Sequence, residues 1–263
     1  MSPEGRLAEL YEEIRQLGLR CLVMGGHAAR FHGVERMTVD YDLHLAVDEA
    51  QWRELAAILA RGPLLGASGF REGPSWRPDD FRRFVIGQLP DGREERLELW
   101  RRNHLLAPFG ELWERRTEGD YGNGRVAFLG IEDLIRSKET EREDDWTDVA
   151  ALEEIADERR LLSHAPNVLS DLRSRRGFER ALAAGLLEDS EFVARAASAA
   201  THPIPCAYLA PYTDSAFGLR NLSPAIAEIL GGPLRKVSPR SARHLALVEA
   251  VRRLYRRDAM AKD

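Results

Sequence analysis

Residues 21–47 read CLVMGGHAARFHGVERMTVDYDLHLAV. The first four form an apolar run whose length suits a buried strand, and the two glycines that end it permit a tight turn and close approach of a ligand to the backbone. We expect a helix to begin there and to include residues 27–32. Free N–H groups and the helix dipole at such an N-terminus attract phosphate. The segment therefore predicts a strand, a phosphate-binding turn at Gly25 and Gly26, and a helix.

The second half of this segment, residues 39–47, alternates between apolar and polar residues in the way that a strand does. This alternation places Asp40 and Asp42 on one face and the intervening residues on the other. Magnesium prefers carboxylate oxygens, with nucleotide phosphates and water completing its shell. The spacing predicts a divalent cation site beside the phosphate-binding turn. The alternative is a solvated polar face on an edge strand.

In this order, the strand, Gly-Gly, the helix and Asp-x-Asp resemble the nucleotidyltransferase superfamily of the polymerase-beta type. Within it, the segment is most similar to the AbiEii-type and minimal nucleotidyltransferases, through the pattern Gly-Gly-x-Ala, His-Gly, Arg-x-Thr-x-Asp-x-Asp. A second block, IEDLIRSKETEREDDWTDVAALE at residues 131–153, resembles the Leu-Glu-Asp-Leu, Lys, Asp-x-x-Asp block of that family. The two blocks cover only a minor part of the chain.

The resemblance implies transfer of a nucleoside monophosphate from an NTP to an acceptor hydroxyl with Mg²⁺, or Mn²⁺ in its place. In-line displacement at the α-phosphate requires cations that neutralise charge on the attacking and leaving oxygens. A third carboxylate is then expected on a neighbouring strand, where Glu98 stands in place of the usual aspartate and serves as metal ligand or base. The longer side chain leaves open an ordinary ion pair with Arg96.

The resemblance also implies a set of nucleotide-binding residues besides the two glycines. Arg36 and Thr38 enter the strand of the aspartates and hold phosphate or order the carboxylates. Lys138 lies on the mostly apolar face of its helix, where a buried ammonium is costly unless an anion is near. A phosphate oxygen would supply that anion, and the alternative is a side chain that extends to water.

Asp145 and Asp148 complete the second block. The resemblance places them near the lysine or the acceptor, whereas their position at a helix start equally predicts that Asp145 is an N-cap. Asp144 stands where the family usually has a lysine, which makes the local charge more negative.

Composition limits the remaining function classes. A chain of 263 residues that is 44% hydrophobic can bury a sizeable core. No apolar run approaches the roughly 18 residues of a membrane span, and the charged N-terminal helix lacks a signal-peptide core, so we expect a cytoplasmic protein without a membrane partner. Cys21 and Cys206 have no metal-ligand spacing, and we interpret both as packing residues.

The coarse order of elements predicts an α/β (α+β) fold. Helices are expected at residues 5–17 and 48–61, the latter with Asp48 as N-cap, and a hairpin is expected between 84–87 and 96–100. A short strand at 126–129 precedes the helix near Ile131. We expect a mixed-sheet nucleotidyltransferase core at residues 1–162 and a mainly helical C-terminal region at residues 163–263.

Charge is unevenly distributed along the chain. The net charge is −5, yet residues 235–263 contain nine Lys/Arg against three Asp/Glu. A basic helix there predicts binding of a polyanionic acceptor, and the alternative is an ordinary amphipathic helix with solvated arginines.

The acceptor is not determined by these patterns, and RNA, protein and small molecules all remain. Resemblance to AbiEii-type proteins implies the toxin of a toxin–antitoxin pair, with an antitoxin partner. Resemblance to small-molecule members implies modification of an antibiotic. A catalytically silent member that binds a nucleotide or a partner is the third hypothesis, supported by glutamate at the third carboxylate position.

Overall fold

The structure, a computed structural model, describes residues 2–66, 70–89, 91–140 and 142–209. The chain divides into two compact units, Met1–Glu139 and Thr140–Asp263, and each is described by itself. This division falls before the long helix α7, whereas the sequence predicts a boundary after residue 162. That boundary stays a prediction.

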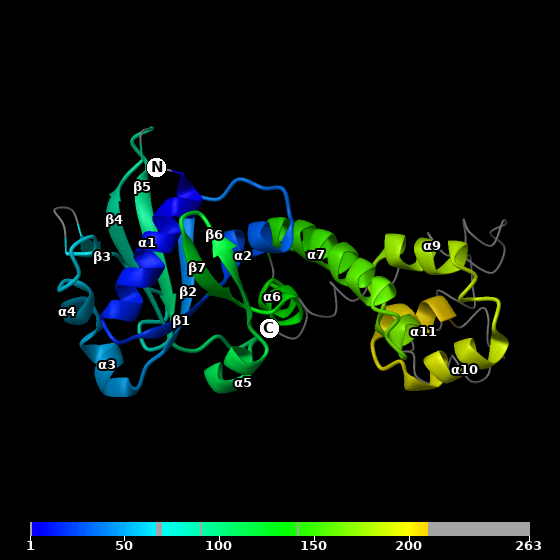
Figure 1. Cartoon of the computed structure of the whole chain (residues 1–263). Coiled ribbons are helices and arrows are strands. Elements are labelled where there is room, and N and C mark those ends of the chain that lie inside the picture. Colours follow the sequence, from blue (N-terminus) through cyan, green and yellow to red (C-terminus); the bar gives the residue numbers. More distant parts are fainter. Residues whose placement is uncertain (1, 67–69, 90, 141, 210–263) are drawn as a thin grey trace. The chain divides into compact units, whose positions relative to one another are not determined.

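The first unit is built on a seven-stranded mixed sheet with the order β3-β4-β5-β2-β1-β7-β6 (Figure 1). The pairs β2/β5 and β1/β7 are parallel, and the other neighbours are antiparallel. The strands are β1 (Arg20–Val23), β2 (Asp40–Ala46), β3 (Arg71–Glu72), β4 (Phe81–Gln88), β5 (Glu94–Trp100), β6 (Thr117–Tyr121) and β7 (Gly124–Phe128). The predicted mixed sheet is confirmed, with the aspartate strand β2 at its centre.

Six helices accompany the sheet: α1 (Pro3–Gln16), α2 (Gly25–His32), α3 (Glu49–Arg53), α4 (Leu55–Leu59), α5 (Phe109–Glu114) and α6 (Ile131–Ser137). Helix α1 begins at a Ser2 cap and buries Leu7, Leu10 and Ile14 completely, which confirms the predicted helical spacing. It packs on β1, β6 and β7. In Figure 1 it crosses the face of the sheet in blue.

The predicted helix at residues 48–61 is two short helices, α3 and α4, that meet at Glu54. Asp48 caps α3 through a capping box with Gln51, as the sequence predicts. The break has a physical cause, because the Trp52 carbonyl accepts a hydrogen bond from Arg82 Nη1 at 2.7 Å. That carbonyl would otherwise be the acceptor for the next helical turn.

Strands β4 and β5 form the predicted hairpin. Leu89 N donates to Arg93 O at 2.8 Å across the turn, and Gly92 adopts the left-handed conformation with φ +83°. The register of the pair shifts between Val85 and Gly87, where the ladder is irregular. This shift determines which side chains of β4 lie beside those of β5.

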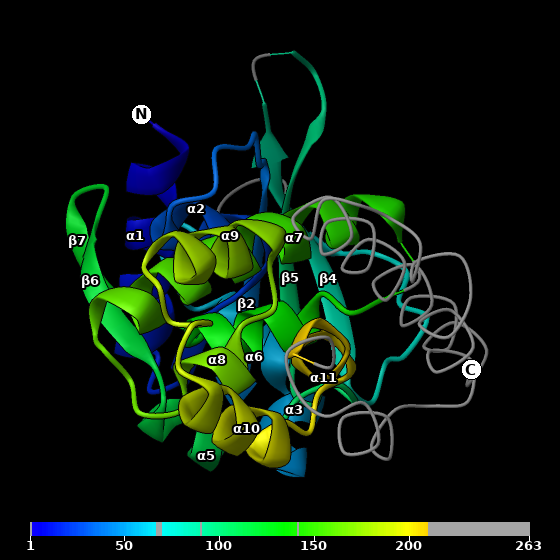
Figure 2. The same cartoon turned by 90° about the vertical axis from the view of Figure 1, so that its right-hand side faces the viewer.

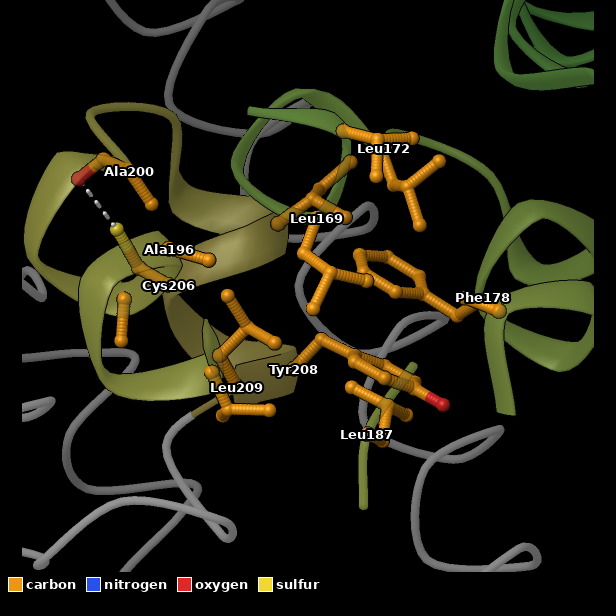
Figure 3. Packing of buried hydrophobic residues seen from close by; sticks show 14 residues of the cluster. Leu169, Leu172, Phe178, Leu187, Ala196, Ala200, Cys206, Tyr208 and Leu209 are labelled. Carbon is orange, nitrogen blue, oxygen red and sulfur yellow. Dashed lines mark hydrogen bonds between the residues drawn. The ribbon is translucent and has the colours of Figure 1, made fainter. Parts of the chain in front are cut away.

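The described part of the second unit is helical, as predicted for the C-terminal region. It contains α7 (Glu143–Leu162), α8 (Val168–Asp171), α9 (Arg175–Ala183), α10 (Ser190–Ala199) and α11 (Pro203–Leu209). Figure 2 shows α8 to α11 grouped together, and Figure 3 shows the apolar cluster that they share. Phe178 stacks on Tyr208 with ring centroids 3.6 Å apart, and the Cys206 thiol donates to Ala200 O.

A buried carboxylate connects α7 to the start of α9. Asp157 is fully buried and accepts hydrogen bonds from the backbone N–H groups of Arg173 and Ser174, from the Ser174 hydroxyl and from Arg160 Nη1. Ser174 is in turn the N-cap of α9. Burial raises the pKa of Asp157, and these donors oppose that rise.

Two further predictions concern the whole chain. Cys21 and Cys206 are both buried, which confirms that they are packing residues. The predicted basic helix at residues 235–263 lies outside the described residues and stays a prediction. In the described ranges, no helix has the length and apolar character needed to cross a membrane.

Candidate functional site

The predicted carboxylates meet on the two central parallel strands. The register pairs Asp42 of β2 with Glu98 of β5, and Asp40 with Arg96. Tyr41 and Leu43, which alternate with the aspartates along β2, are buried. The prediction that Asp40 and Asp42 share one face is therefore confirmed, and Glu98 lies beside Asp42 on the neighbouring strand. We call Asp40, Asp42 and Glu98 the carboxylate row.

Glu98 is also paired across the hairpin with Arg83 of β4. The Nε and Nη2 atoms of Arg83 both approach Glu98 Oε1, at 2.8 and 2.7 Å. The alternative that Glu98 pairs with Arg96 is wrong, because Arg96 contacts Glu94 at 3.3 Å instead. Sequence reasoning missed Arg83, because β4 carries two adjacent arginines, Arg82 and Arg83, and only the strand register decides which of them lies beside Glu98.

The glycine turn lies directly against the carboxylate row. Gly25 has φ +61°, and a Cβ there would overlap the carboxylate of Asp42 and lie 2.8 Å from its Cβ. The amide of Met24 donates to Asp42 O at 2.9 Å, which holds the end of β1 beside β2. Gly25 is therefore required both for its left-handed backbone and for this close contact.

Gly26 lies against the loop between α2 and β2, which contains Arg36 and Thr38. A Cβ on Gly26 would lie 2.7 Å from Thr38 Cβ and 3.5 Å from Arg36 Cζ. The structure thus brings together both glycines, Arg36, Thr38 and Asp42, as the sequence predicts. Side chains of the protein itself, those of Asp42, Thr38 and Arg36, thus lie against the two glycines.

Helix α2 begins at Gly25 itself, two residues before His27, the first residue after the glycines. Its N-cap residue, Met24, makes no side-chain capping bond. His27 in this first turn is fully buried, stacks on Tyr41 at 5.2 Å and contacts Tyr121 Oη through Nδ1 at 3.0 Å. It packs the helix start, and burial lowers its pKa to about 4.

The positive charge of Lys138 acts on Asp42 of the carboxylate row. Burial raises the pKa of Asp42 well above its ordinary 3.8, the negative charge of Glu98 raises it further, and the Lys138 ammonium opposes the rise. Lys138 is only 6% exposed, which contradicts the alternative that its side chain extends to water. It is the C-cap residue of α6.

Asp145 and Asp148 belong to the second unit, where both are buried. Asp145 accepts a hydrogen bond from Thr140 Oγ1 at 2.6 Å and lies 3.8 Å from Arg142 Nε. The alternative that Asp145 is the N-cap of its helix is wrong, because α7 begins at Glu143 with Arg142 in the cap position. Asp145 therefore lies inside the first turn of α7, where its negative charge interacts favourably with the positive end of the helix dipole.

The donor set of the carboxylate row suits a hard cation. All three side chains offer oxygen, the ligand that Mg²⁺ and Mn²⁺ take, and the mutual repulsion that raises the pKa of Asp42 would be relieved by a divalent ion. In the conformation described here, no group of three or more His, Cys, Asp or Glu among the described residues is already arranged as a metal-ligand cluster. Asp40 and Asp42 are therefore the core of the candidate site.

Comparisons with known proteins add little to this geometry. No protein-family model matches the sequence, and no curated protein matches it. Among solved structures, the chain is similar to an antigenic nucleotidyltransferase-like protein from Paracoccidioides brasiliensis, at 18% identity over 57% of this chain and 75% of that chain, with a TM-score of 0.39. Similarity at this level supports no conclusion about function.

Proposed function

We propose that this protein is a nucleotidyltransferase, which transfers a nucleoside monophosphate from an NTP to an acceptor hydroxyl and releases pyrophosphate. One observation carries the proposal: the Gly25 backbone packs directly on Asp42, which is paired in register with Glu98. A turn able to receive phosphate is thus fixed beside carboxylates able to hold a cation.

Each residue then has a role that follows from its position. Asp40 and Asp42 would hold Mg²⁺, or Mn²⁺ in its place, and Glu98 would hold the ion or accept the proton of the acceptor hydroxyl. The bound ion supplies neutralisation of phosphate charge during in-line displacement. The N–H groups at the start of α2 would bind the nucleotide phosphates, and the buried Lys138 would place a positive charge near them.

Arg36 and Thr38 support the same turn from the side of Gly26. Their contacts fix the loop that enters β2, so that the turn and the carboxylate row keep their relative position. For Asp145 and Asp148, which lie in the second unit, the nucleotide-binding role stays a proposal.

The identity of the acceptor determines the biological role of this activity. The toxin of a toxin–antitoxin pair, with an antitoxin partner, and an antibiotic-modifying enzyme are both compatible with the same site. A catalytically silent nucleotide-binding protein is favoured by one observation, the Arg83–Glu98 ion pair, which occupies one oxygen of the third carboxylate. Incubation with each labelled NTP, Mg²⁺ and cell lysate distinguishes these roles by whether label enters RNA, protein, a small molecule or nothing.

The site itself is tested by calorimetry of Mg²⁺–NTP binding. We expect Asp40→Asn and Asp42→Asn each to weaken metal-dependent affinity at least tenfold while the circular dichroism spectrum is retained. Asp120→Asn, which changes an exposed aspartate of β6, serves as a matched control and should bind like the parent. If both site variants bind Mg²⁺–NTP as the parent does, the assigned site is wrong.

A further inference from the structure

An aromatic cluster with one exposed member, Trp76, adjoins the carboxylate row. Trp76 is 62% exposed, although large apolar side chains in the first unit are otherwise mostly buried. Its ring centroid lies 6.1 Å from that of Trp100 and 5.9 Å from that of Phe81, and Phe81 and Trp100 are 4.6 Å apart. We call Trp76, Phe81 and Trp100 the aromatic patch.

Strand register fixes where this patch lies. Trp100 follows Glu98 by two residues on β5, so both lie on the same face about 7 Å apart along the strand. Phe81 of β4 is paired with Trp100, as Arg83 is paired with Glu98. The aromatic patch is therefore the next row of the sheet after the one that contains Glu98 and Asp42.

Sheet order separates the patch from the phosphate-binding turn. The glycine turn follows β1, on one side of β2, whereas the patch lies on β5 and β4, on the other side. The carboxylates of β2 and β5 lie between the two. A nucleotide whose phosphates occupy the turn would leave the patch on the acceptor side of the metal-binding carboxylates.

One exposed arginine lies beside the patch. Arg77 has its guanidinium carbon 5.1 Å from the centroid of the Trp76 ring. The other four arginines of residues 76–83 and 100–102 are in ion pairs with Glu72, Glu98 and Asp80. An exposed tryptophan beside an exposed arginine matches the chemistry of an unpaired nucleobase followed by a phosphate, because every base has a face that stacks on an aromatic ring.

We propose that the aromatic patch is the acceptor subsite, where a nucleobase of a single-stranded nucleic acid stacks on Trp76 while Arg77 contacts the adjoining phosphate. This inference rests on the proposed function, since it assigns the acceptor side of that site. The rings of Trp100 and Phe81 lie beside that of Trp76, with centroids 6.1 and 5.9 Å from it. A single strand is required, because the base must be unstacked to reach the ring.

The test measures binding of fluorescein-labelled 12-nucleotide single strands of RNA and DNA to the full chain by anisotropy. We expect saturable binding, weaker binding of the same sequences as duplexes, and roughly a tenfold loss of affinity in Trp76→Ala. Trp76→Phe, which keeps an aromatic ring, should lose less than about threefold. Leu162→Ala is the matched control, because it removes another exposed large apolar side chain, at 73% exposure, from the second unit.

A second measurement addresses the arginine. Arg77→Gln should reduce the slope of log affinity against log salt by about 0.7, the value for one phosphate contact with a single strand. Arg93→Gln, an exposed arginine at the β4–β5 turn, should leave that slope unchanged. Equal affinities in the parent and Trp76→Ala, or no saturable binding by the parent, would overturn the proposal. Entry of label from NTP into protein in place of nucleic acid would overturn it as well.

Failure of this inference is distinguishable from failure of the proposed function. Trp76-dependent oligonucleotide binding without metal-dependent NTP binding would support the aromatic patch as a nucleic-acid site and reject the enzyme. Metal-dependent NTP binding that requires Asp42, combined with unchanged oligonucleotide binding in Trp76→Ala, would retain the enzyme and reject the patch.

Discussion

Arg83 and Glu98 face each other across the β4–β5 hairpin, and two nitrogens of the guanidinium converge on the single oxygen Oε1 at 2.7 and 2.8 Å. The pair lies next to Asp42, whose pKa is raised by burial and by the negative charge of Glu98. Arg83 thus partly neutralises the negative charge of the three carboxylates, because it is paired with Glu98. Under the proposed function, a divalent cation bound by Glu98 would have to compete with this arginine.

The first prediction follows from that competition. Arg83→Gln keeps a hydrogen-bond donor beside Glu98 and removes the positive charge, so the affinity of the nucleotide-free protein for Mn²⁺ should rise about fivefold, equivalent to ~1 kcal/mol. Titration calorimetry with Mn²⁺ measures this change. Arg93→Gln removes an arginine from the turn of the same hairpin and should leave Mn²⁺ affinity within twofold. An unchanged affinity in Arg83→Gln would mean that the ion does not meet Glu98.

The second prediction concerns the contact between the glycine turn and Asp42. Gly25→Ala forces a side chain into the left-handed backbone and into the Asp42 carboxylate, so the free energy of unfolding should fall by about 2–4 kcal/mol. Urea denaturation measures the loss. Gly110→Ala in α5, where a Cβ meets nothing within 4 Å, should change stability by no more than about 1 kcal/mol. Equal stabilities of the two variants would contradict the contact.

The third prediction concerns acid stability. The pKa of His27 is about 4 in the folded chain, against an ordinary value of 6.5, because its ring is buried. Below pH 6.5 the unfolded chain therefore binds the proton that the folded chain excludes, and the free energy of unfolding should fall by ~3 kcal/mol between pH 6.5 and 4. Above pH 7 this residue should contribute no pH dependence.

Comparison of His27→Phe with the parent by urea denaturation from pH 4 to 7.5 tests this assignment. The variant retains a ring against Tyr41, and the dependence of its stability on pH between 6.5 and 4 should be smaller by about 1.4 kcal/mol per pH unit. His104→Gln changes an exposed histidine and should follow the parent. A His27→Phe profile that parallels the parent would show that another group controls the acid response.

The fourth prediction concerns the buried carboxylate of the second unit. Asp157→Asn replaces acceptor oxygens with an amide N–H₂ that faces the amides of Arg173 and Ser174, so the unit should lose about 2–4 kcal/mol. Hydrogen exchange should accelerate at these two amides and in the first turn of α9. Glu158→Gln, an exposed neighbour, should change stability by less than about 0.5 kcal/mol. Parental exchange rates at both amides in Asp157→Asn would contradict the role of this carboxylate.

The parts of the site that sequence predicts are those that depend on local pattern. Asp40 and Asp42 share a face because a strand alternates, and Gly25 marks a turn because it follows a short apolar run. Glu98 is expected from the family resemblance, and alternation alone does not place it, because its position beside Asp42 depends on the register of β2 and β5.

The parts that sequence does not predict depend on register and on distant contacts. Arg83 meets Glu98 only because the hairpin shifts between Val85 and Gly87, and a slip of one residue would turn every side chain of β4 to the opposite face. The break between α3 and α4 depends on Arg82, far along the chain, which takes a helical carbonyl. Neither contact leaves a local pattern in the sequence.

The hairpin of β4 and β5 has a consequence for how this protein could be re-engineered. Glu98, Arg83 and the aromatic patch all lie within the continuous stretch 76–100, whereas the glycine turn and both aspartates come from 25–42. Under the proposed assignments, the turn that would receive the NTP phosphates and the patch that would receive the acceptor lie on separate pieces of one sheet. Exchange of the hairpin alone, with its register preserved, would be a route to chimeras that keep their NTP and change what they modify.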